Sequence, residues 1–162
     1  MPIIIRPAAT DADWQQGLAI LHHVYVGEGH SPAERAKQTF RREVLEPEGN
    51  FLIAVQEDDV VLGATILLHP GSALQQVAQQ GEREFRLLAV ESAARGQGAG
   101  EALVQECIER CKTEGAEALV LWTRPVMTAA QRLYERLGFG RVPHRDEEDP
   151  RGFTRLVYRL VL

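Results

Sequence analysis

The sequence predicts an α/β (α+β) fold, with a mixed central β-sheet of about six to seven strands flanked by about four helices. Three observations predict it. Short β-branched and aliphatic runs alternate with amphipathic segments in the middle of the chain. Pairs of apolar runs separated by short polar turns, which suit hairpins, occupy both ends. A chain of 162 residues that is 44% hydrophobic can bury one sizeable core, so we expect residues 1–162 to form a single domain.

The first half of the chain predicts helices between strands. Thr10-Asp11 can cap a helix that places Trp14 and Tyr25 on one apolar face. Ser31-Pro32 resembles the start of a second helix, with proline at its first position. The expected elements are a strand at 3–5, a helix after 10–11, a helix from 31–32 to about 45, and strands at 51–55 and 60–68 joined by a tight turn at 57–59.

The second half of the chain predicts strands and helices in alternation. Gly115 and Gly138 mark the ends of its two helices. The expected elements are a polar loop at 69–83, a strand at 84–90, a helix at 98–113, a strand at 119–122, a helix at about 128–137, and closing strands at 139–142 and 154–160.

Charge and composition exclude several classes of function. The chain carries 18 Lys and Arg against 23 Asp and Glu and has no dense basic cluster, so we expect no nucleic-acid partner. No apolar run is long enough to span a bilayer, and residues 1–6 suit a first strand better than a signal peptide, so we expect no membrane association. Two cysteines are too few for a disulfide framework, which favours a cytoplasmic location.

A glycine-rich turn joins the strand at 84–90 to the helix at 98–113. Its sequence is Arg95-Gly-Gln-Gly-Ala-Gly100. The first amides of a helix have no partner within the helix, and the helix dipole adds partial positive charge there. Without side chains at Gly96, Gly98 and Gly100, an anionic ligand can approach those amides closely, and Arg95 adds a full charge. The turn therefore predicts a site for a phosphate or pyrophosphate.

Other nucleotide-binding motifs fit this turn less well. A phosphate-binding loop of the NTPase kind needs Gly-Lys-Ser/Thr, which the sequence lacks. A dinucleotide fingerprint needs a third glycine where Glu101 stands, and residues 91–95 make a long approach for its tight turn. A glycine-rich helix start that only packs closely on its strand remains an alternative.

Here the sequence resembles a known family. The pattern Arg95-x-x-Gly98-x-Gly100 resembles the Q/R-x-x-G-x-G/A signature of the GNAT superfamily of N-acetyltransferases. The segment from Ala130 to Phe139 resembles the downstream element of that superfamily, at the expected distance. The resemblance implies the GNAT fold and an acyltransferase activity. It would move an acetyl group from acetyl-CoA, the co-substrate, to a primary amine, most simply of a small molecule, by direct attack in a ternary complex without metal.

The resemblance also implies which residues bind coenzyme A. In the family, the strand before the signature pairs with the pantetheine arm, and the amides of the turn hold the pyrophosphate. Carried over, these residues are Leu88, Ala89 and Val90 for pantetheine, and Arg95, Gly96, Gln97, Gly98, Ala99 and Gly100 for the pyrophosphate. Met127 stands where many members have an asparagine that contacts pantetheine, so that contact departs from the family pattern.

Two residues are candidates for catalysis. Tyr134 matches the family tyrosine that donates a proton to the departing thiolate, although it also shares one apolar helix face with Leu133 and Leu137. Glu84 opens the signature strand, where some relatives have the base, and a solvated carboxylate at the start of a strand is the alternative. A main-chain N–H near Val90 would stabilise the developing oxyanion.

Several other groups have a structural and a functional interpretation. Cys107 and Cys111 lie on an apolar helix stripe and are expected in the core. The segment that follows the first helix covers the acceptor site in family members, so His22, Tyr25, Glu28 and His30 could line it. The carboxylates at 146–149 could attract a cationic amine or form a solvated turn. The loop at 69–83 could be a lid or a contact in a homodimer.

The sequence does not identify the acceptor, so other functions stay open. The same fold could serve as a non-catalytic acyl-CoA sensor, for which Met127 is the sequence hint. It could also acetylate protein N-termini or lysines, which requires an open groove. Acetylation of aminoacyl-tRNA is disfavoured by the acidic net charge of −5.

Overall fold

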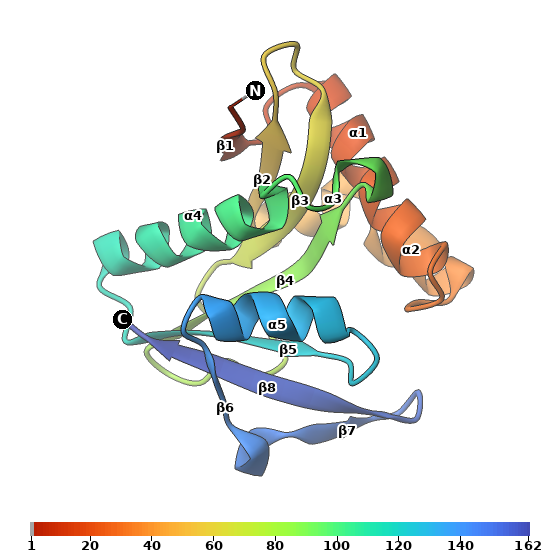
Figure 1. Ribbon diagram of the computed structural model, residues 1–162. Coiled ribbons are helices and arrows are strands. Elements are labelled where there is room, and N and C mark those ends of the chain that lie inside the picture. The colour runs from red at the N-terminus through yellow and green to blue at the C-terminus, as the bar shows by residue number, and fades with distance from the viewer. Residues whose placement is uncertain (1) are drawn as a thin grey trace.

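In the computed structural model, residues 2–162 form one mixed β-sheet with helices on both of its faces (Figure 1). The strand order is β1-β2-β3-β4-β5-β8-β6, with β7 paired to β8, and β4–β5 is the parallel pair. The bounds are β1 Ile4–Pro7, α1 Asp11–Leu21, α2 Ala33–Thr39, α3 Arg42–Leu45, β2 Gly49–Val55, β3 Val61–Leu68, β4 Glu82–Val90, α4 Ala99–Glu114, β5 Ala118–Thr123, α5 Thr128–Arg136, β6 Gly140–Arg141, β7 Glu147–Asp149 and β8 Phe153–Val161.

The predicted fold class is confirmed, with one more strand and one more helix than expected. The extra helix arises because the predicted helix up to residue 45 breaks at Phe40, whose backbone leaves the helical region (φ −85°, ψ 66°). This break turns the buried Phe40 ring against His22 and Tyr25, with ring centroids 5.3 and 5.9 Å apart. The extra strand, β7, is short and forms between the two predicted closing strands, at the carboxylates of 146–149.

The sheet buries a separate apolar core on each face. One core packs α4 and α5 against the sheet, and it contains Cys107 and Cys111, both 0% exposed, as the apolar stripe predicted. The other core packs α1, α2 and α3 on the opposite face, where the Trp14 ring stacks on Phe51 at 4.6 Å. The helices are thereby fixed on either side of the strands that carry the site. In residues 2–162 no helix is long and apolar enough to cross a membrane.

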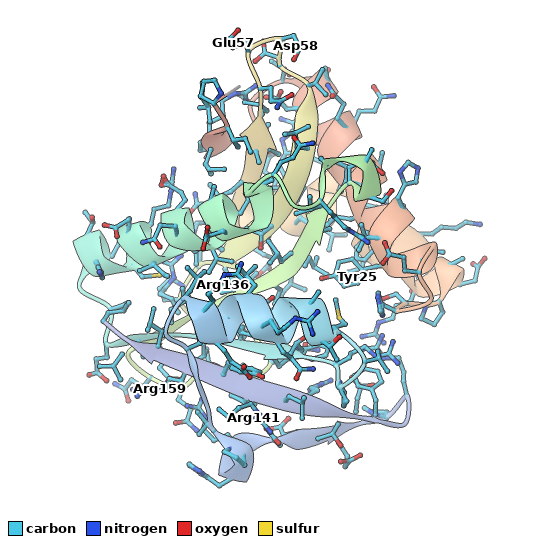
Figure 2. The ribbon with its side chains drawn as sticks, in the orientation of Figure 1. Tyr25, Glu57, Asp58, Arg136, Arg141 and Arg159 are labelled. Atoms are coloured by element: carbon cyan, nitrogen blue, oxygen red, sulfur yellow. The ribbon has the colours of Figure 1, made fainter. Side chains whose placement is uncertain are left out.

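The first helix begins as its sequence suggests, and it ends at Leu21, before Tyr25. The Thr10 side chain accepts a hydrogen bond from the Asp13 amide at 3.1 Å, and the Asp13 carboxylate accepts one from the Thr10 amide, which makes a capping box. After α1 the chain continues as a wider π-turn over His22–Val26. This turn points Tyr25 toward β4, whereas Glu57 and Asp58 lie at the solvent-exposed tip of the β2–β3 hairpin (Figure 2).

The sheet opens between its two parallel strands. β4 and β5 pair only from Glu82–Glu84 to Ala118–Val120, and beyond this point they diverge. On its other edge β4 stays paired with β3, through a bulge at which Leu87 adopts φ +62°. A left-handed conformation at a leucine costs about 1 kcal/mol and persists only where its surroundings hold it. The divergence leaves the β5-facing edge of residues 85–90 without a strand partner.

Candidate active site

The glycine turn reaches α4 through two left-handed glycines. Gly96 has φ +81° and Gly98, the residue before the helix, has φ +89°. A Cβ added at either position would meet no atom within 4 Å, so both face open space. At Gly100, by contrast, a Cβ would lie 3.5 Å from Val90 and 3.6 Å from Leu133. The first two glycines therefore allow approach from outside, and the third allows close packing of helix on strand.

The amides of this turn are free to bind a ligand. Within residues 2–162, the N–H groups of 96–101 donate no hydrogen bond, and the first helical bond runs from the Ala102 amide to the Gly98 carbonyl at 3.0 Å. Successive unpaired N–H groups at the positive end of a sixteen-residue helix fit a pyrophosphate. The backbone of this turn thus has free donors and open space for an anion, and the anion site stays a prediction.

Arg95 stands beside the turn and already has a carboxylate partner. Its guanidinium forms an ion pair with Glu28 and donates a hydrogen bond to the Val90 carbonyl at 3.3 Å. Both charged side chains are partly exposed, at 45% and 39%, so the pair is weak. It nevertheless ties the segment after α1 to the glycine turn, and Glu28 is held there rather than in the acceptor cavity.

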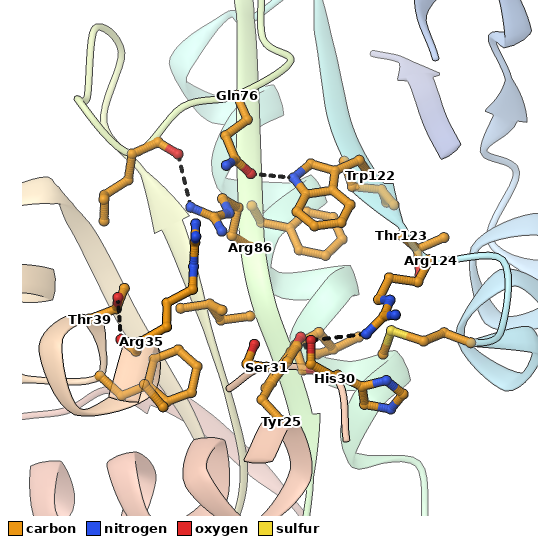
Figure 3. Close-up of a pocket in the computed structure, with 18 of the residues that line it drawn as sticks. Tyr25, His30, Ser31, Arg35, Thr39, Gln76, Arg86, Trp122, Thr123 and Arg124 are labelled. Carbon is orange, nitrogen blue, oxygen red and sulfur yellow. Dashed lines mark hydrogen bonds between the residues drawn. The ribbon is translucent and has the colours of Figure 1, made fainter. Parts of the chain in front are cut away.

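A cavity of about 250 Å³ occupies the opening between β4 and β5 (Figure 3). Its walls come from β4, β5, Met127 before α5, Tyr134 in α5, the segment between α1 and α2, α2 itself, the loop before β4, and Arg151. Of the side chains predicted to line an acceptor site, Tyr25 and His30 do so, and His22 and Glu28 do not. Met127 also lines the cavity, at the position where the family pattern has asparagine.

Tyr134 belongs to both the core and the cavity wall. Its ring is 5% exposed and packs edge-on against Phe85 and Phe139, with centroids 5.9 Å apart in each case. Its hydroxyl makes no hydrogen bond to any residue in 2–162, and the residue lines the cavity. Burial raises the pKa of this phenol well above its usual value, and the neighbouring Tyr25 adds to the rise. Tyr134 is therefore a protonated, uncommitted donor beside the opening.

Tyr25 holds the backbone on the opposite wall. Its hydroxyl donates a hydrogen bond to the Leu88 carbonyl at 3.0 Å, directly after the Leu87 bulge. Of the residues predicted to contact pantetheine, Leu88 lines the cavity, while Ala89 and Val90 pack on the two cores that flank the sheet. These three assignments depend on the backbone of β4, which lies along the opening, and they stay predictions.

Glu84 serves the fold rather than the cavity. It is 0% exposed, and its carboxylate accepts three hydrogen bonds at 3.0 Å, from the amides of Gln76, Val77 and Ala78. It does not line the cavity. A carboxylate that is saturated by backbone N–H groups and shut off from solvent is poorly placed to accept a proton from an amine. The role of Glu84 as a base therefore stays a prediction that this geometry disfavours, because the carboxylate anchors the loop before β4.

The structure adds basic residues that the sequence analysis missed. Arg35, Arg86 and Arg124 all line the cavity, and Figure 3 shows them around one space. Arg86 had a signal in the sequence, because it is a charge inside an otherwise apolar strand segment, Phe85 to Val90. The other two had none, since α2 and the end of β5 are brought to the cavity only by the fold.

The acidic run offers nothing to a cationic acceptor. Asp146 binds Arg141 at 2.7 Å and Asp149 binds Arg151 at 2.9 Å and Arg155 at 3.0 Å, while the Thr154 hydroxyl donates to Glu148 at 2.6 Å. The cavity wall includes none of these carboxylates. Three of the four carboxylates are thus paired with arginines and Glu148 with a hydroxyl, and residues 147–149 form strand β7 instead of a solvated turn.

Known proteins share the motifs and the fold of this chain. The model of the acetyltransferase (GNAT) family matches residues 13–139. N-acetylaspartate synthetase from Danio rerio is 35% identical over 112 residues, which cover 68% of this chain and 37% of that protein. Mycothiol acetyltransferase from Sanguibacter keddieii is 32% identical over 140 residues, covering 84% of this chain and 42% of that protein. The chain thus spans about two fifths of the length of these relatives.

A solved structure shows the same architecture over the whole chain. PaiA N-acetyltransferase from Thermoplasma acidophilum, determined in complex with coenzyme A, superposes with a TM-score of 0.72 at 16% identity and covers 100% of both chains. At this identity the likeness establishes the fold, and the bound coenzyme A is a property of that protein.

Proposed function

Because the chain belongs to the acetyltransferase (GNAT) family, we propose that it transfers an acetyl group from acetyl-CoA to the primary amine of a small molecule. One observation carries the proposal. The opening between β4 and β5 runs beside a glycine turn with unpaired amides, and a cavity of about 250 Å³ lies in that opening. A site for an anionic carrier and a space for a small acceptor are therefore contiguous.

The donor would be held by backbone groups. The N–H groups of residues 96–101 would bind the pyrophosphate of coenzyme A, whose charge the α4 dipole favours. The β5-facing edge of Leu88, Ala89 and Val90 would pair with the amides of the pantetheine arm, in place of the missing strand. Neither role requires a particular side chain, so Met127 in place of asparagine does not remove the site.

The residues around the opening then fit direct transfer. The neutral amine nitrogen forms a bond to the thioester carbonyl carbon, and the carbon–sulfur bond breaks. The Tyr134 hydroxyl gives its proton to the leaving thiolate, and a main-chain N–H near Val90 stabilises the carbonyl oxygen as it gains charge. The nitrogen loses one of its two protons to solvent and keeps the other in the amide, and Tyr134 regains its proton from solvent.

Both cysteines disfavour a route through an acyl-enzyme. Cys107 and Cys111 are 0% exposed in the core beneath α4. Burial raises the pKa of each thiol, so neither is a ready nucleophile. We also propose no dedicated base, because Glu84 is committed to the loop before β4. A cytoplasmic location and a homodimer stay predictions from the sequence.

Thermal unfolding with and without acetyl-CoA tests the proposed function. A ligand at 100 times its Kd adds about 2.7 kcal/mol, which shifts the Tm of a chain of this size by about 5–10 °C. We expect this shift with acetyl-CoA and none with NADH or ATP, followed by thiol release when an accepted amine is added. A shift with NADH alone would refute the donor site. Acetyl-CoA binding without transfer to any amine would favour the sensor.

A further inference from the structure

The cavity wall is strongly one-sided in charge. Four of its residues are arginines and none is aspartate or glutamate. The whole chain, by contrast, carries a net charge of −5. A concentration of positive charge against the average of the chain, inside a partly enclosed space, indicates the charge of what the space holds.

Only one of these arginines is neutralised by the protein. Arg151 binds Asp149 through two nitrogens, at 2.9 and 3.1 Å. Within residues 2–162, Arg35, Arg86 and Arg124 form no ion pair with any carboxylate. The carboxylate whose charge most affects Arg86 is Glu84, whose oxygens are occupied by the amides of Gln76, Val77 and Ala78.

Arg35 and Arg86 extend toward one another across the cavity (Figure 3). Arg86 uses one of its N–H groups on the Leu74 carbonyl, at 3.1 Å, and the Arg35 guanidinium makes no hydrogen bond in residues 2–162. Two guanidinium groups that face each other repel, and burial of Arg86 increases the cost. A carboxylate or phosphate between them would replace that repulsion with charged hydrogen bonds to both.

Arg124 adds a third donor on the other side of the same space. Its Nη1 donates to the His30 carbonyl at 3.0 Å, and its guanidinium lies 4.1 Å from the Phe153 ring centroid. Its Nε is buried without a hydrogen-bond acceptor in the described residues. The guanidinium is thus fixed in place by the protein while retaining an unsatisfied donor.

The donor substrate does not account for this charge. In the proposed function its pyrophosphate lies at the amides of residues 96–101, none of which lines the cavity. The thioester end, which enters at Leu88 and Tyr134, carries no charge. The remaining occupant of the cavity is the acceptor.

We propose that the acceptor amine carries a compact anionic group, a carboxylate or a phosphate, which binds between Arg35 and Arg86. This inference rests on the proposed function, since it defines the acceptor of that reaction. The anionic group holds the acceptor on the β4 side, and its amine extends toward Leu88 and Tyr134. Polyamines and other purely cationic amines are excluded as acceptors, because they would face three uncompensated guanidinium groups.

Calorimetric titration of the protein saturated with coenzyme A tests the anion site without needing the amine. Coenzyme A occupies the glycine turn, so added anions report on the cavity. Succinate and inorganic phosphate are the two probes, and succinamide is the neutral control. We expect saturable binding of at least one anion and none of succinamide, and the tighter anion identifies the group. Binding of neither anion, together with a normal acetyl-CoA shift, overturns the inference and leaves the proposed function standing.

Matched variants locate the site. We expect Arg86→Gln to weaken the bound anion by about 10- to 100-fold, as for loss of a charged hydrogen bond, and Arg35→Gln to weaken it less because that side chain is exposed. Arg151→Gln is the control, since it removes an arginine of the same wall that already binds Asp149, and we expect less than about a threefold change. Equal losses in all three variants would mean a nonspecific charge effect and would overturn the assignment.

Turnover gives an independent measurement. Thiol release is compared for glycine and glycinamide, for phosphoethanolamine and ethanolamine, and for spermidine. We expect the anionic member of at least one pair to have the higher kcat/KM, and Arg86→Gln to raise the KM of that acceptor alone, with the acetyl-CoA KM unchanged. Equal use of neutral partners, or preference for spermidine, overturns the inference. Failure to bind acetyl-CoA would instead overturn the proposed function.

Discussion

The proposed site has a half for the donor and a half for the acceptor, and the two differ in whether backbone or side chains form them. The donor half consists of backbone from one continuous stretch, from the Leu87 bulge to the first amides of α4. The proposed acceptor half consists of side chains from segments far apart in the sequence, among them Tyr25, Arg86 and Arg124. A backbone site needs only glycine and strand-forming residues at fixed spacing, whereas a side-chain site can change with any residue that reaches it. The first half therefore carries the family motif, and the second half is where we propose that the acceptor is selected.

The two halves also differ in the kind of charge that they present to a ligand. The glycine turn presents unpaired amides and a helix dipole, which are partial charges that cost little when no ligand is bound. The cavity presents full charges on Arg35, Arg86 and Arg124, held without carboxylate partners in the described residues. Burial of Arg86 without an ion-pair partner in the described residues costs free energy when the cavity is empty, and a bound anion would offset that cost.

The largest effect should follow from Gly98→Asp, which attacks the backbone half. The new Cβ would point into the open space where no atom lies within 4 Å, and its carboxylate would face the pyrophosphate. We expect the Kd for acetyl-CoA to rise by about 100-fold or more, because like charges in close contact at a partly dry site cost several kcal/mol. Calorimetric titration with acetyl-CoA measures it, and an unchanged Kd would refute the assignment of the turn.

Gly115→Asp is the matched control for this variant. Gly115 ends the same helix, has φ +78°, and likewise has no atom within 4 Å of an added Cβ. Both variants should lose about 1 kcal/mol of stability from the left-handed conformation. If Gly115→Asp weakened acetyl-CoA as much as Gly98→Asp, the loss would reflect damage to α4 and not the site.

An intermediate effect should follow from Tyr134→Phe, where the two halves meet. The ring and its packing on Phe85 and Phe139 stay, and only the hydroxyl is lost. We expect kcat to fall by about 100-fold, as for loss of a general acid, while the Kd for acetyl-CoA changes less than about twofold. In the wild type, the raised pKa of Tyr134 keeps the acid protonated, so activity should not decline near the ordinary tyrosine pKa of about 10.

Tyr158→Phe separates this effect from a loss of packing. Tyr158 is 1% exposed, its hydroxyl donates to Glu135 at 3.2 Å, and it does not line the cavity. Its removal should cost about 1 kcal/mol of stability and leave kcat unchanged within about twofold. Equal losses of kcat in the two variants would remove Tyr134 from its proposed role.

The sequence predicted most of the fold because the fold depends on local signals. The capping residue Thr10, the helix-ending Gly115 and the hairpin turn around Asp58 each lie where the structure needs them. The break of the helix at Phe40 was not predicted because a tertiary contact accompanies it: the Phe40 ring packs against His22 and Tyr25. Strand β7 was missed because its carboxylates are paired by arginines that only the folded hairpin brings near.

For the site, too, the sequence predicted the residues that lie in local motifs and missed those that only the fold brings together. The glycine turn and Tyr134 lie in local motifs, in which residues close together in the sequence are also close together in the structure. The positive charge of the cavity wall arises because the fold brings Arg35 and Arg124 to the same cavity as Arg86. Residues this far apart in the sequence form no local pattern. The acidic run at 146–149 is the opposite case, since a cluster of charge that is conspicuous in the sequence is mostly paired with arginines in the folded chain and does not line the cavity.

The smallest effect on activity should follow from Glu84→Gln, where motif-based reasoning and geometry disagree most. The amide would present two donors to a position that now accepts three backbone N–H groups, so we expect a loss of about 1–3 kcal/mol of stability. Since the carboxylate does not line the cavity, kcat should change less than about threefold. Glu148→Gln, on the exposed hairpin, should alter stability by no more than about 0.5 kcal/mol. A large fall in kcat at an unchanged Tm would restore Glu84 as the base, and the acceptor half would then share a residue with the motif.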